Sequence, residues 1–213
     1  MKSYIVKKVD NDERSLQVIW QSISKVDIDC FPWDTSGYKP MTEVEMFYTN
    51  EYFKLRFIAH EKKVRAIYLN INEPVYEDSC VEFFIVPKSQ MEERYMNFEF
   101  NAFGNLLLGI GSNRHNRALI NVDPAIFEIK TSINPGNIRE YDGSVWTLEF
   151  KIPFEFIEKY FGKIDFSSGY KMRGNFYKCG DKTKFPHYGS WNPIVNEKPD
   201  FHLSQYFGEF ILE

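Results

Sequence analysis

The sequence predicts an all-β fold: an antiparallel β-sandwich of jelly-roll type with one short helix, formed as a single domain over residues 1–213. Strand-like runs rich in aromatic and β-branched residues recur along the whole chain. Several of them alternate apolar and polar residues, which is typical of a strand with one buried face. Turn-forming pairs such as Asp142-Gly143 separate the runs, and no Gly/Ser-rich linker divides the chain.

The alternation also predicts which side of each strand is buried. In the run Ser144–Ile152, the even-numbered residues from Trp146 onward are apolar and the odd-numbered ones are polar, so Trp146 is expected in the core. The expected strands are Tyr4–Val9, Glu43–Tyr48, Tyr52–His60, Arg65–Ile71, Ser79–Pro87, Tyr95–Ala102, Asn105–Gly111, Ile126–Lys130, Ser144–Ile152, Tyr170–Cys179 and Phe207–Leu212.

The one expected helix follows Pro153, a residue that suits the first position of a helix. Phe154, Ile157 and Phe161 then recur at the spacing of a single helical face. Gly162 is a suitable residue to end the helix.

The run Ser79–Pro87 is apolar on both faces, which indicates a central strand covered on both sides. Glu82 is the only charged residue inside it. Because burying an unpaired charge is costly, two interpretations remain open. Glu82 either pairs with Arg56 or Arg173, or it faces a wet cleft and contacts a ligand.

Composition and charge exclude several classes of protein. The formal net charge is −4 and no long basic block occurs, so nucleic acid is not an expected partner. No apolar run approaches the roughly 20 residues that span a bilayer, so no membrane partner is expected.

The first ten residues lack the apolar core of a signal peptide, which favours a cytoplasmic chain or one whose leader has been removed. The three cysteines form no C-x-x-C pair and are expected to be buried free thiols.

Several segments, taken in order, resemble the family 9 carbohydrate-binding modules. The run Tyr76–Ile85 resembles the aromatic-(E/D)-D-S-V-E-hydrophobic strand of this family. The similarity extends over most of the chain, from Val44 to Leu212. The other matching segments are Tyr95–Gly104, Trp146–Phe154, Arg173–Tyr177 and Trp191 followed by Phe207–Phe210.

The resemblance implies a β-sandwich that binds carbohydrate without cleaving it. In well-known members two aromatic side chains grip the sugar, and the matching positions here are Tyr76 and Trp191. The glutamate that hydrogen-bonds sugar hydroxyls matches Glu82, whereas Glu99 stands where some members have arginine. Members are often joined to xylanases, so the implied ligand is a mono- or oligosaccharide of a plant-type polysaccharide such as xylan or cellulose. This role in carbohydrate breakdown suggests export, in conflict with the missing leader.

Some members of the family hold structural calcium, and carboxylates are the ligands that calcium prefers. Four acidic residues are candidates for such a site, although no calcium-loop pattern occurs among them: Glu73, Glu77, Asp78 and Asp181. No other cofactor is expected.

The chemistry of a sugar suits the residue types present. Aromatic rings match its C–H faces, and carboxylate, amide and guanidinium groups match its hydroxyls, because each forms two or more hydrogen bonds. No residue is assigned a catalytic role. The predicted ligand-binding residues are Tyr76, Glu82, Glu99, Asn101, Arg173, Asn175 and Trp191.

Two other functions remain open from the sequence. A glycoside hydrolase would use a pair of carboxylates, for which Glu82 with Glu99 or Glu149 would serve. A protein-interaction sandwich would explain the aromatic content as core and interface, and an exposed apolar patch without a hydrogen-bonding cleft would favour it.

Overall fold

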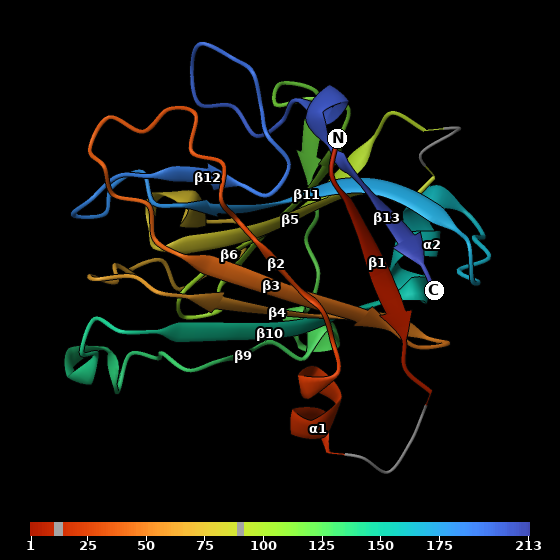
Figure 1. The fold of residues 1–213 in the computed structure, drawn as a ribbon, viewed down its shortest axis with the longest axis horizontal. Helices are drawn as coiled ribbons and strands as arrows, with labels where there is room; N and C mark the ends of the chain where they lie inside the picture. The colour runs from red at the N-terminus through yellow and green to blue at the C-terminus, as the bar shows by residue number, and fades with distance from the viewer. Residues whose placement is uncertain (11–14, 89–91) are drawn as a thin grey trace.

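The computed structural model describes residues 1–10, 15–88 and 92–213, and it consists of two β-layers packed face to face (Figure 1). The first layer contains, in spatial order, β8 (Arg117–Leu119), β7 (Leu106–Gly111), β6 (Tyr95–Asn101), β5 (Cys80–Val86), β11 (Lys171–Cys179) and β13 (Gly208–Leu212), with β12 (Tyr188–Ser190) beside β11. The second contains β3 (Thr42–Tyr48), β4 (Tyr52–Ala59), β10 (Trp146–Pro153) and β9 (Lys130–Thr131), with β2 (Lys25–Asp27) beside β3.

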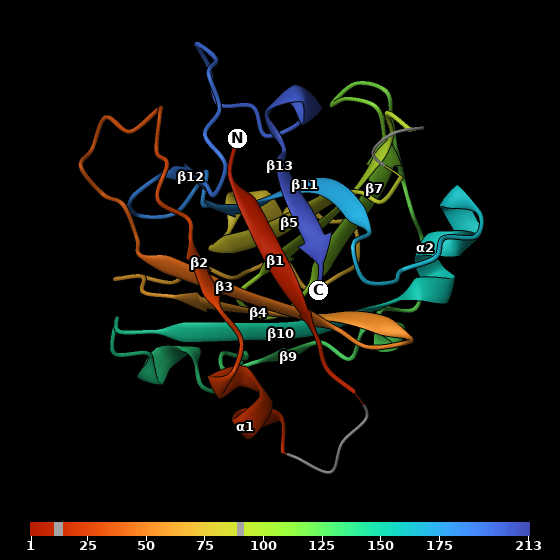
Figure 2. The ribbon, with the colours of Figure 1, turned by 45° about the vertical axis from the view of Figure 1, so that its right-hand side comes forward.

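Strand β1 (Ser3–Lys8) joins the two layers. Residues 3–6 pair with β13, and Lys7 and Lys8 pair with β3 (Figure 2). Both pairings are parallel, whereas the other neighbouring strands are antiparallel. The predicted β-sandwich is therefore confirmed, but its sheet is mixed and not purely antiparallel.

Two predicted strands are wrong. Arg65–Ile71 forms an extended loop, because the backbone N–H groups of Ile67 and Tyr68 donate to the Asp78 carboxylate instead of to a neighbouring strand. The first part of Ile126–Lys130 belongs to a short 3₁₀ helix, η2 (Pro124–Phe127). The strands β2, β8 and β12 were not predicted, because three residues are too few to show alternation.

The predicted helix is confirmed as α2 (Phe154–Phe161), which ends at Gly162 with a positive φ of 71°. Pro153 precedes the helix as its N-cap. A second helix, α1 (Leu16–Gln21), corrects the prediction of one helix; it is so short that its apolar spacing is ambiguous. The other 3₁₀ helices are η1 (Val75–Glu77), η3 (Ile138–Glu140) and η4 (Ser204–Tyr206).

Aromatic side chains fill the space between the layers. Trp146 is fully buried there, as its alternation predicts, and Phe83, Phe98, Phe150 and Phe176 lie in the same cluster. Aromatic pairs in contact contribute more to the stability of the fold than expected from their buried area alone. No helix in the described parts of the chain has the length and apolar character needed to cross a bilayer.

A second apolar cluster covers the outer face of the first layer. It contains Phe84 of β5, Tyr177 of β11, and Phe201 and Phe207 from the C-terminal segment. Strand β5 is therefore covered on both sides, as its double apolar pattern predicts. The C-terminal segment that covers it also forms part of the site described below.

A buried polar network crosses one end of the core. Lys178 on β11 is fully buried, and its Nζ lies 3.1 Å from Glu61 Oε2. The same carboxylate accepts hydrogen bonds from Trp146 Nε1 and the Ser79 hydroxyl. Lys178 Nζ also donates to His187 Nε2 at 2.9 Å, so the ring proton lies on Nδ1, which donates to the Phe185 carbonyl.

This arrangement predicts a stability that falls in mild acid. Burial and the Lys178 charge lower the pKa of His187 from 6.5 to about 2. Below about pH 6.5 the unfolded chain binds a proton that the folded protein does not, so the free energy of unfolding falls by about 1.4 kcal/mol per pH unit. In urea titrations, the wild type should lose about 2 kcal/mol more between pH 7 and pH 5 than His187→Gln does.

The exposed His115 provides the matched control. Replacing it by glutamine removes a histidine that lies outside the buried network, so the pH profile should equal that of the wild type. An equal acid loss in wild type and His187→Gln would contradict a neutral, buried His187.

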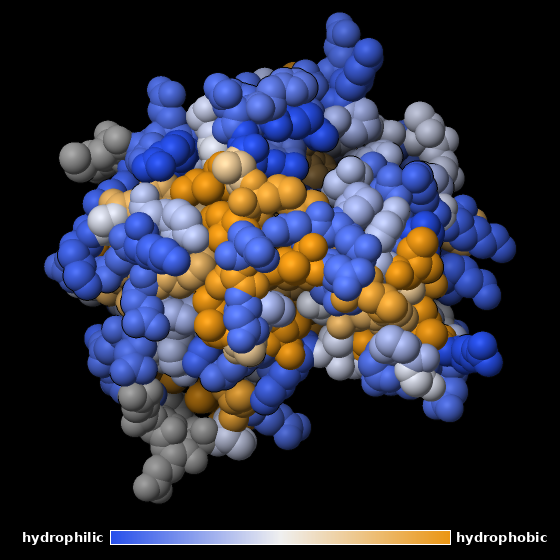
Figure 3. All heavy atoms as spheres, turned by 180° about the vertical axis from the view of Figure 1, so that it is seen from behind, coloured by the Kyte–Doolittle hydropathy of each residue, from blue (hydrophilic) through white to orange (hydrophobic). Residues whose placement is uncertain are grey.

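Exposed apolar side chains also occur, among them Ile67, Leu69 and Leu119. Figure 3 shows apolar side chains across the middle of the face opposite to that of Figure 1, with hydrophilic side chains around them. Monomeric proteins commonly carry such patches, so this one does not by itself indicate a partner.

Candidate ligand-binding site

A polar cavity of about 250 Å³ lies against the outer face of the first layer. Strands β5, β6, β8, β11 and β12 each contribute side chains to it, and the segment before η4 closes one side. Its lining residues are Tyr76, Glu82, Glu99, Arg114, Arg117, Cys179, Asp181, Tyr188, Pro199, Asp200, Phe201 and His202.

The strand register places two carboxylates side by side in this cavity. Glu82 on β5 is directly opposite Glu99 on β6, so both side chains project from the same face of the layer. Glu82 is only 3% exposed and Glu99 only 2%. Their neighbours Val81 and Phe83 point into the core between the layers, in keeping with the period of two.

The two carboxylates have different partners. Glu99 Oε1 accepts hydrogen bonds from Arg117 Nη1 at 3.0 Å and Asn97 Nδ2 at 2.9 Å. Glu82 Oε1 accepts one from the Cys179 thiol at 3.0 Å, and no ion pair of Glu82 occurs in the described residues. Burial raises the pKa of Glu99 to about 7 against the opposing effect of Arg117. Burial and the adjacent Glu99 raise the pKa of Glu82 well above its usual value.

The two arginines that line the cavity are each paired with an acidic side chain. Arg117 pairs with Glu99, and Arg114 pairs with Asp200 at 3.1 Å. Asp181 has no ion pair within the described ranges, and burial raises its pKa to about 6 although Tyr188 forms a hydrogen bond with it. The cavity therefore has an excess of acidic groups.

Aromatic rings supply the apolar part of the lining. Tyr76 in η1 is 36% exposed and reaches the cavity. Phe201 stacks on the buried Tyr177 ring at a centroid distance of 4.1 Å. The imidazole of His202 contacts the Tyr95 hydroxyl at 2.7 Å and accepts from Arg117 Nη1 at 3.3 Å, so it orients that arginine. Burial and the nearby arginines lower the pKa of His202 to about 2, which keeps it neutral.

Three of the predicted ligand-binding residues, Tyr76, Glu82 and Glu99, meet in this cavity. The ion pair suggested for Glu82 is wrong. Arg56 pairs with Glu45 and Glu149, because it lies in β4 of the other layer.

Trp191 does not line the cavity, contrary to the expectation for an aromatic residue in a loop. It is 2% exposed and stacks on Phe210 at a centroid distance of 5.4 Å. Gly208 makes this position possible, because a Cβ there would lie 2.5 Å from the indole ring. The structure therefore gives Trp191 the position of a core residue.

The two predicted amide residues form hydrogen bonds with backbone groups of neighbouring segments. Asn175 is buried, donates to the Asn192 carbonyl and accepts from the backbone N–H of Asn192. Asn101 donates to the Asp78 carboxylate and accepts from the backbone N–H of Phe103, which fixes the turn after β6. Neither amide is among the residues that line the cavity.

The predicted arginine also lies outside the cavity. Arg173 Nη1 donates to the Ser204 carbonyl, so it contacts the segment that covers the layer. The arginines that do line the cavity are Arg114 and Arg117, which sequence reasoning missed together with Asp200. Their one sequence signal is the occurrence of two arginines close together, Arg114 in the turn after β7 and Arg117 at the start of β8.

The acidic residues suggested for calcium do not fit a common site. Glu73 accepts from backbone N–H groups of its own turn, and Glu77 pairs with Lys182. Asp78 is bound by Arg65 and by Asn101. The fourth candidate, Asp181, lines the cavity described above, and the four carboxylates form no shared metal-binding group in the described part of the chain.

The chain is similar to carbohydrate-binding proteins. The model of the family described as carbohydrate-binding family 9 matches residues 13–212. A protein from Bacteroides uniformis ATCC 8492, provisionally named a carbohydrate-binding protein, is 30% identical with a TM-score of 0.85, over 100% of this chain and 99% of its own. The comparison with curated proteins gives no match.

Two further solved structures share the fold. Both are of a family 9 carbohydrate-binding module from Caldicellulosiruptor kristjanssonii, one in complex with glucose and one with cellotriose. The glucose complex is 13% identical and the cellotriose complex 12%, each with a TM-score of 0.65. They cover 100% of this chain and 96% and 94% of their own.

Proposed function

The chain belongs to carbohydrate-binding family 9, and we propose that it binds a mono- or oligosaccharide in the cavity beside β5 and β6. The observation that carries this proposal is the convergence of Glu82, Glu99 and Arg117 on one cavity next to the Tyr76 ring. Carboxylate and guanidinium groups match sugar hydroxyls, and the ring matches a C–H face. The glucose and cellotriose complexes of the Caldicellulosiruptor kristjanssonii module support this ligand class.

The size of the cavity favours the end of a glycan chain over its middle. Its volume of about 250 Å³ is below the roughly 300–1,000 Å³ typical of pockets for drug-sized ligands. It therefore suits one terminal sugar unit, with further units lying outside. Plant-type glycans derived from cellulose or xylan are the proposed source, in carbohydrate breakdown.

Calorimetric titration of glucose, cellobiose, xylobiose and soluble xylan tests this function. Binding of at least one of them by the wild type is the expected result. Reducing-sugar release is measured in the same samples, because Glu82 and Glu99 also form a neighbouring carboxylate pair of the kind used by glycoside hydrolases. Binding without release supports a non-catalytic module, whereas release would replace it with the hydrolase. Absence of binding to every glycan would contradict the proposal.

Replacing Tyr76 by alanine should weaken sugar binding about tenfold, equivalent to about 1.4 kcal/mol, because the variant loses the exposed ring of the cavity. The Tyr76→Phe variant keeps the ring without the hydroxyl and should bind within about threefold of the wild type. Titration calorimetry with the tightest glycan of the panel measures both. Equal affinity of wild type and Tyr76→Ala would rule out stacking on this ring.

A further inference from the structure

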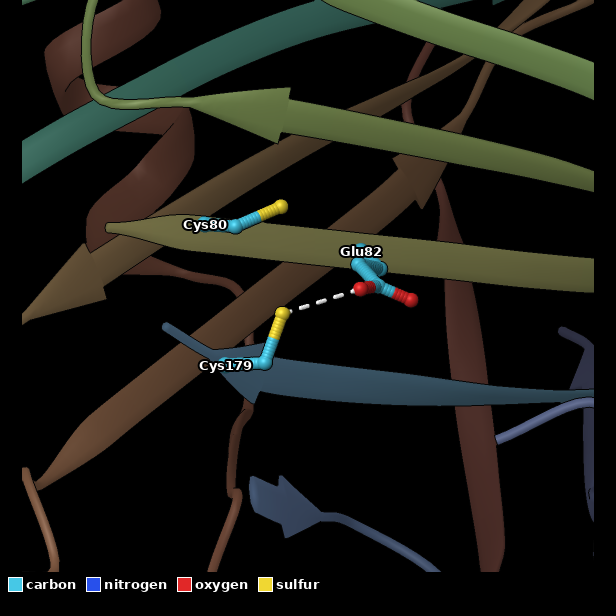
Figure 4. A group of neighbouring side chains, drawn as sticks. All are labelled: Cys80, Glu82 and Cys179. Carbon is cyan, nitrogen blue, oxygen red and sulfur yellow. Dashed lines mark hydrogen bonds between the residues drawn. The ribbon is translucent and has the colours of Figure 1, made fainter. Parts of the chain in front are cut away.

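Two thiols and one carboxylate lie together where β5 and β11 border the cavity. Cys80 and Glu82 are two residues apart on β5 and therefore share a face, and Cys179 is directly opposite Cys80 on β11. Figure 4 shows these three side chains projecting from the two neighbouring strands. Their ligand atoms all lie within 4.8 Å of one another.

We propose that Cys80, Glu82 and Cys179 form a binding site for a thiophilic divalent cation of the Zn²⁺ class. Two thiolates and one carboxylate are a donor set that zinc accepts, with Zn–S bonds of about 2.3 Å and Zn–O bonds of about 2.0–2.2 Å. A tetrahedral ion of this size separates its two sulfur ligands by about 3.8 Å. The atoms, now within 4.8 Å, therefore need to approach by no more than about 1 Å.

The charge of the surroundings supports a cation at this position. Glu82 is 3% exposed and receives a hydrogen bond only from the Cys179 thiol among the described residues. Asp181, two residues after Cys179, also lines the cavity without an ion pair there. Deprotonation of a buried carboxyl without a cation is costly, and a bound dication would compensate the charge of the deprotonated Glu82.

Access and coordination number are consistent with an exchangeable ion. Cys179 and Glu82 line the cavity, so the ion enters from that side, whereas Cys80 is fully buried and is not among the lining residues. Three protein ligands leave the fourth position of a tetrahedral ion for a water or a ligand hydroxyl from the cavity. This inference does not depend on sugar binding, since its ligands and its tests are separate.

Metal binding has to displace protons from the thiols. Burial raises the pKa of Cys80 to about 12 and that of Cys179 well above its usual value, so both are neutral without a metal. Only the deprotonated forms are ligands. The metal therefore competes with the protons of both thiols and with the proton of the Glu82 carboxyl, and its binding is accompanied by the release of protons into the buffer.

Cadmium titration of the full chain, reduced and desalted without oxygen, tests the site. Thiolate-to-metal charge-transfer absorption should rise and saturate at one ion per chain, with release of protons. Both Cys80→Ser and Cys179→Ser should weaken binding about 100-fold or more, because even the loss of an outer-shell partner costs about 10–100-fold. Cys30→Ser is the matched control, since Cys30 lies outside the group and its removal should change nothing.

The wild type provides a second readout that does not depend on the folding of a variant. Because Cys80 and Cys179 are buried even without a metal, alkylation is followed over time with and without the ion by peptide mass spectrometry. Bound Cd²⁺ or Zn²⁺ should slow the modification of these two thiols relative to the metal-free reduced chain and leave the rate at Cys30 unchanged. Absorption that disappears in Cys30→Ser but persists in the other two variants would overturn the inference. So would a Cys80–Cys179 disulfide that persists after reduction, or the absence of saturable binding by the reduced chain.

Discussion

Replacing Lys178 by methionine is expected to lower the free energy of unfolding by about 3–5 kcal/mol. The side chain is fully buried, and its Nζ contacts Glu61, His187 and the Cys179 carbonyl. Methionine fills a similar volume but leaves Glu61 as a buried charge without its cation. Removal of one partner of a buried ion pair is strongly destabilising for this reason. Urea unfolding followed by fluorescence measures the loss.

The matched control is Lys182→Met, because Lys182 also pairs with a glutamate but is 61% exposed. Exposed ion pairs contribute about 0–1 kcal/mol, so this variant should differ from the wild type by less than about 1 kcal/mol. Combining Lys178→Met with Glu61→Gln should restore part of the lost stability, since the unpaired charge is then absent. If Lys178→Met unfolded at the same urea concentration as Lys182→Met, the buried ion pair would not have the predicted importance.

Replacing Trp191 by alanine is expected to cost about 3–5 kcal/mol of stability. The indole lies in the core against Phe176 and Phe210, and alanine would leave a large cavity there. Trp191→Phe retains most of the apolar volume and should cost less. Urea unfolding curves would measure both losses, provided that the dependence of the unfolding free energy on urea concentration is the same in each variant.

Sugar affinity separates a structural Trp191 from a ligand-binding one. Trp191→Phe, which remains folded, should bind glycans as the wild type does, because Trp191 does not line the cavity. A variant with wild-type stability and at least tenfold weaker binding would contradict this placement and return Trp191 to the binding site.

The strand pattern could be predicted from sequence because local alternation determines it. Each run that alternates over six or more residues, such as β10 and β6, appears at the expected place. The apolar character of both faces of β5 predicted that two clusters cover it. In contrast, Arg65–Ile71 has the composition of a strand, but it does not pair as one. The backbone N–H groups of Ile67 and Tyr68 donate to Asp78, which lies 11 and 10 residues further along the chain.

Sequence reasoning predicted some residues of the candidate site but not the contacts that hold it together. Glu82 and Glu99 stand out as charges inside apolar strands, and their meeting follows from pairing of consecutive strands. Arg117 reaches Glu99 through the pairing of β8, a strand of three residues without a visible pattern. His202 comes from a segment 85 residues after Arg117, and no local signal predicts this contact.

The loop sequence around Trp191 did not predict that its ring would be buried. Its neighbours Gly189, Ser190 and Pro193 are typical of an exposed loop, which favoured a binding role. The space for its ring is created by Gly208, which lies on β13 far along the chain. One missing Cβ on a neighbouring strand therefore decides whether the ring is core or surface.

Nuclear magnetic resonance mapping of a sugar titration tests the central claim most directly. In ¹⁵N–¹H correlation spectra recorded with cellobiose and xylobiose, amide shifts should concentrate around Tyr76, Arg117 and Asp181, which border the cavity. Residues of the separate groove near Glu51 and Lys163 serve as the internal control and should not shift. Shifts that cluster at that groove or on another face, with the Tyr76 cavity unchanged, would contradict the proposed site.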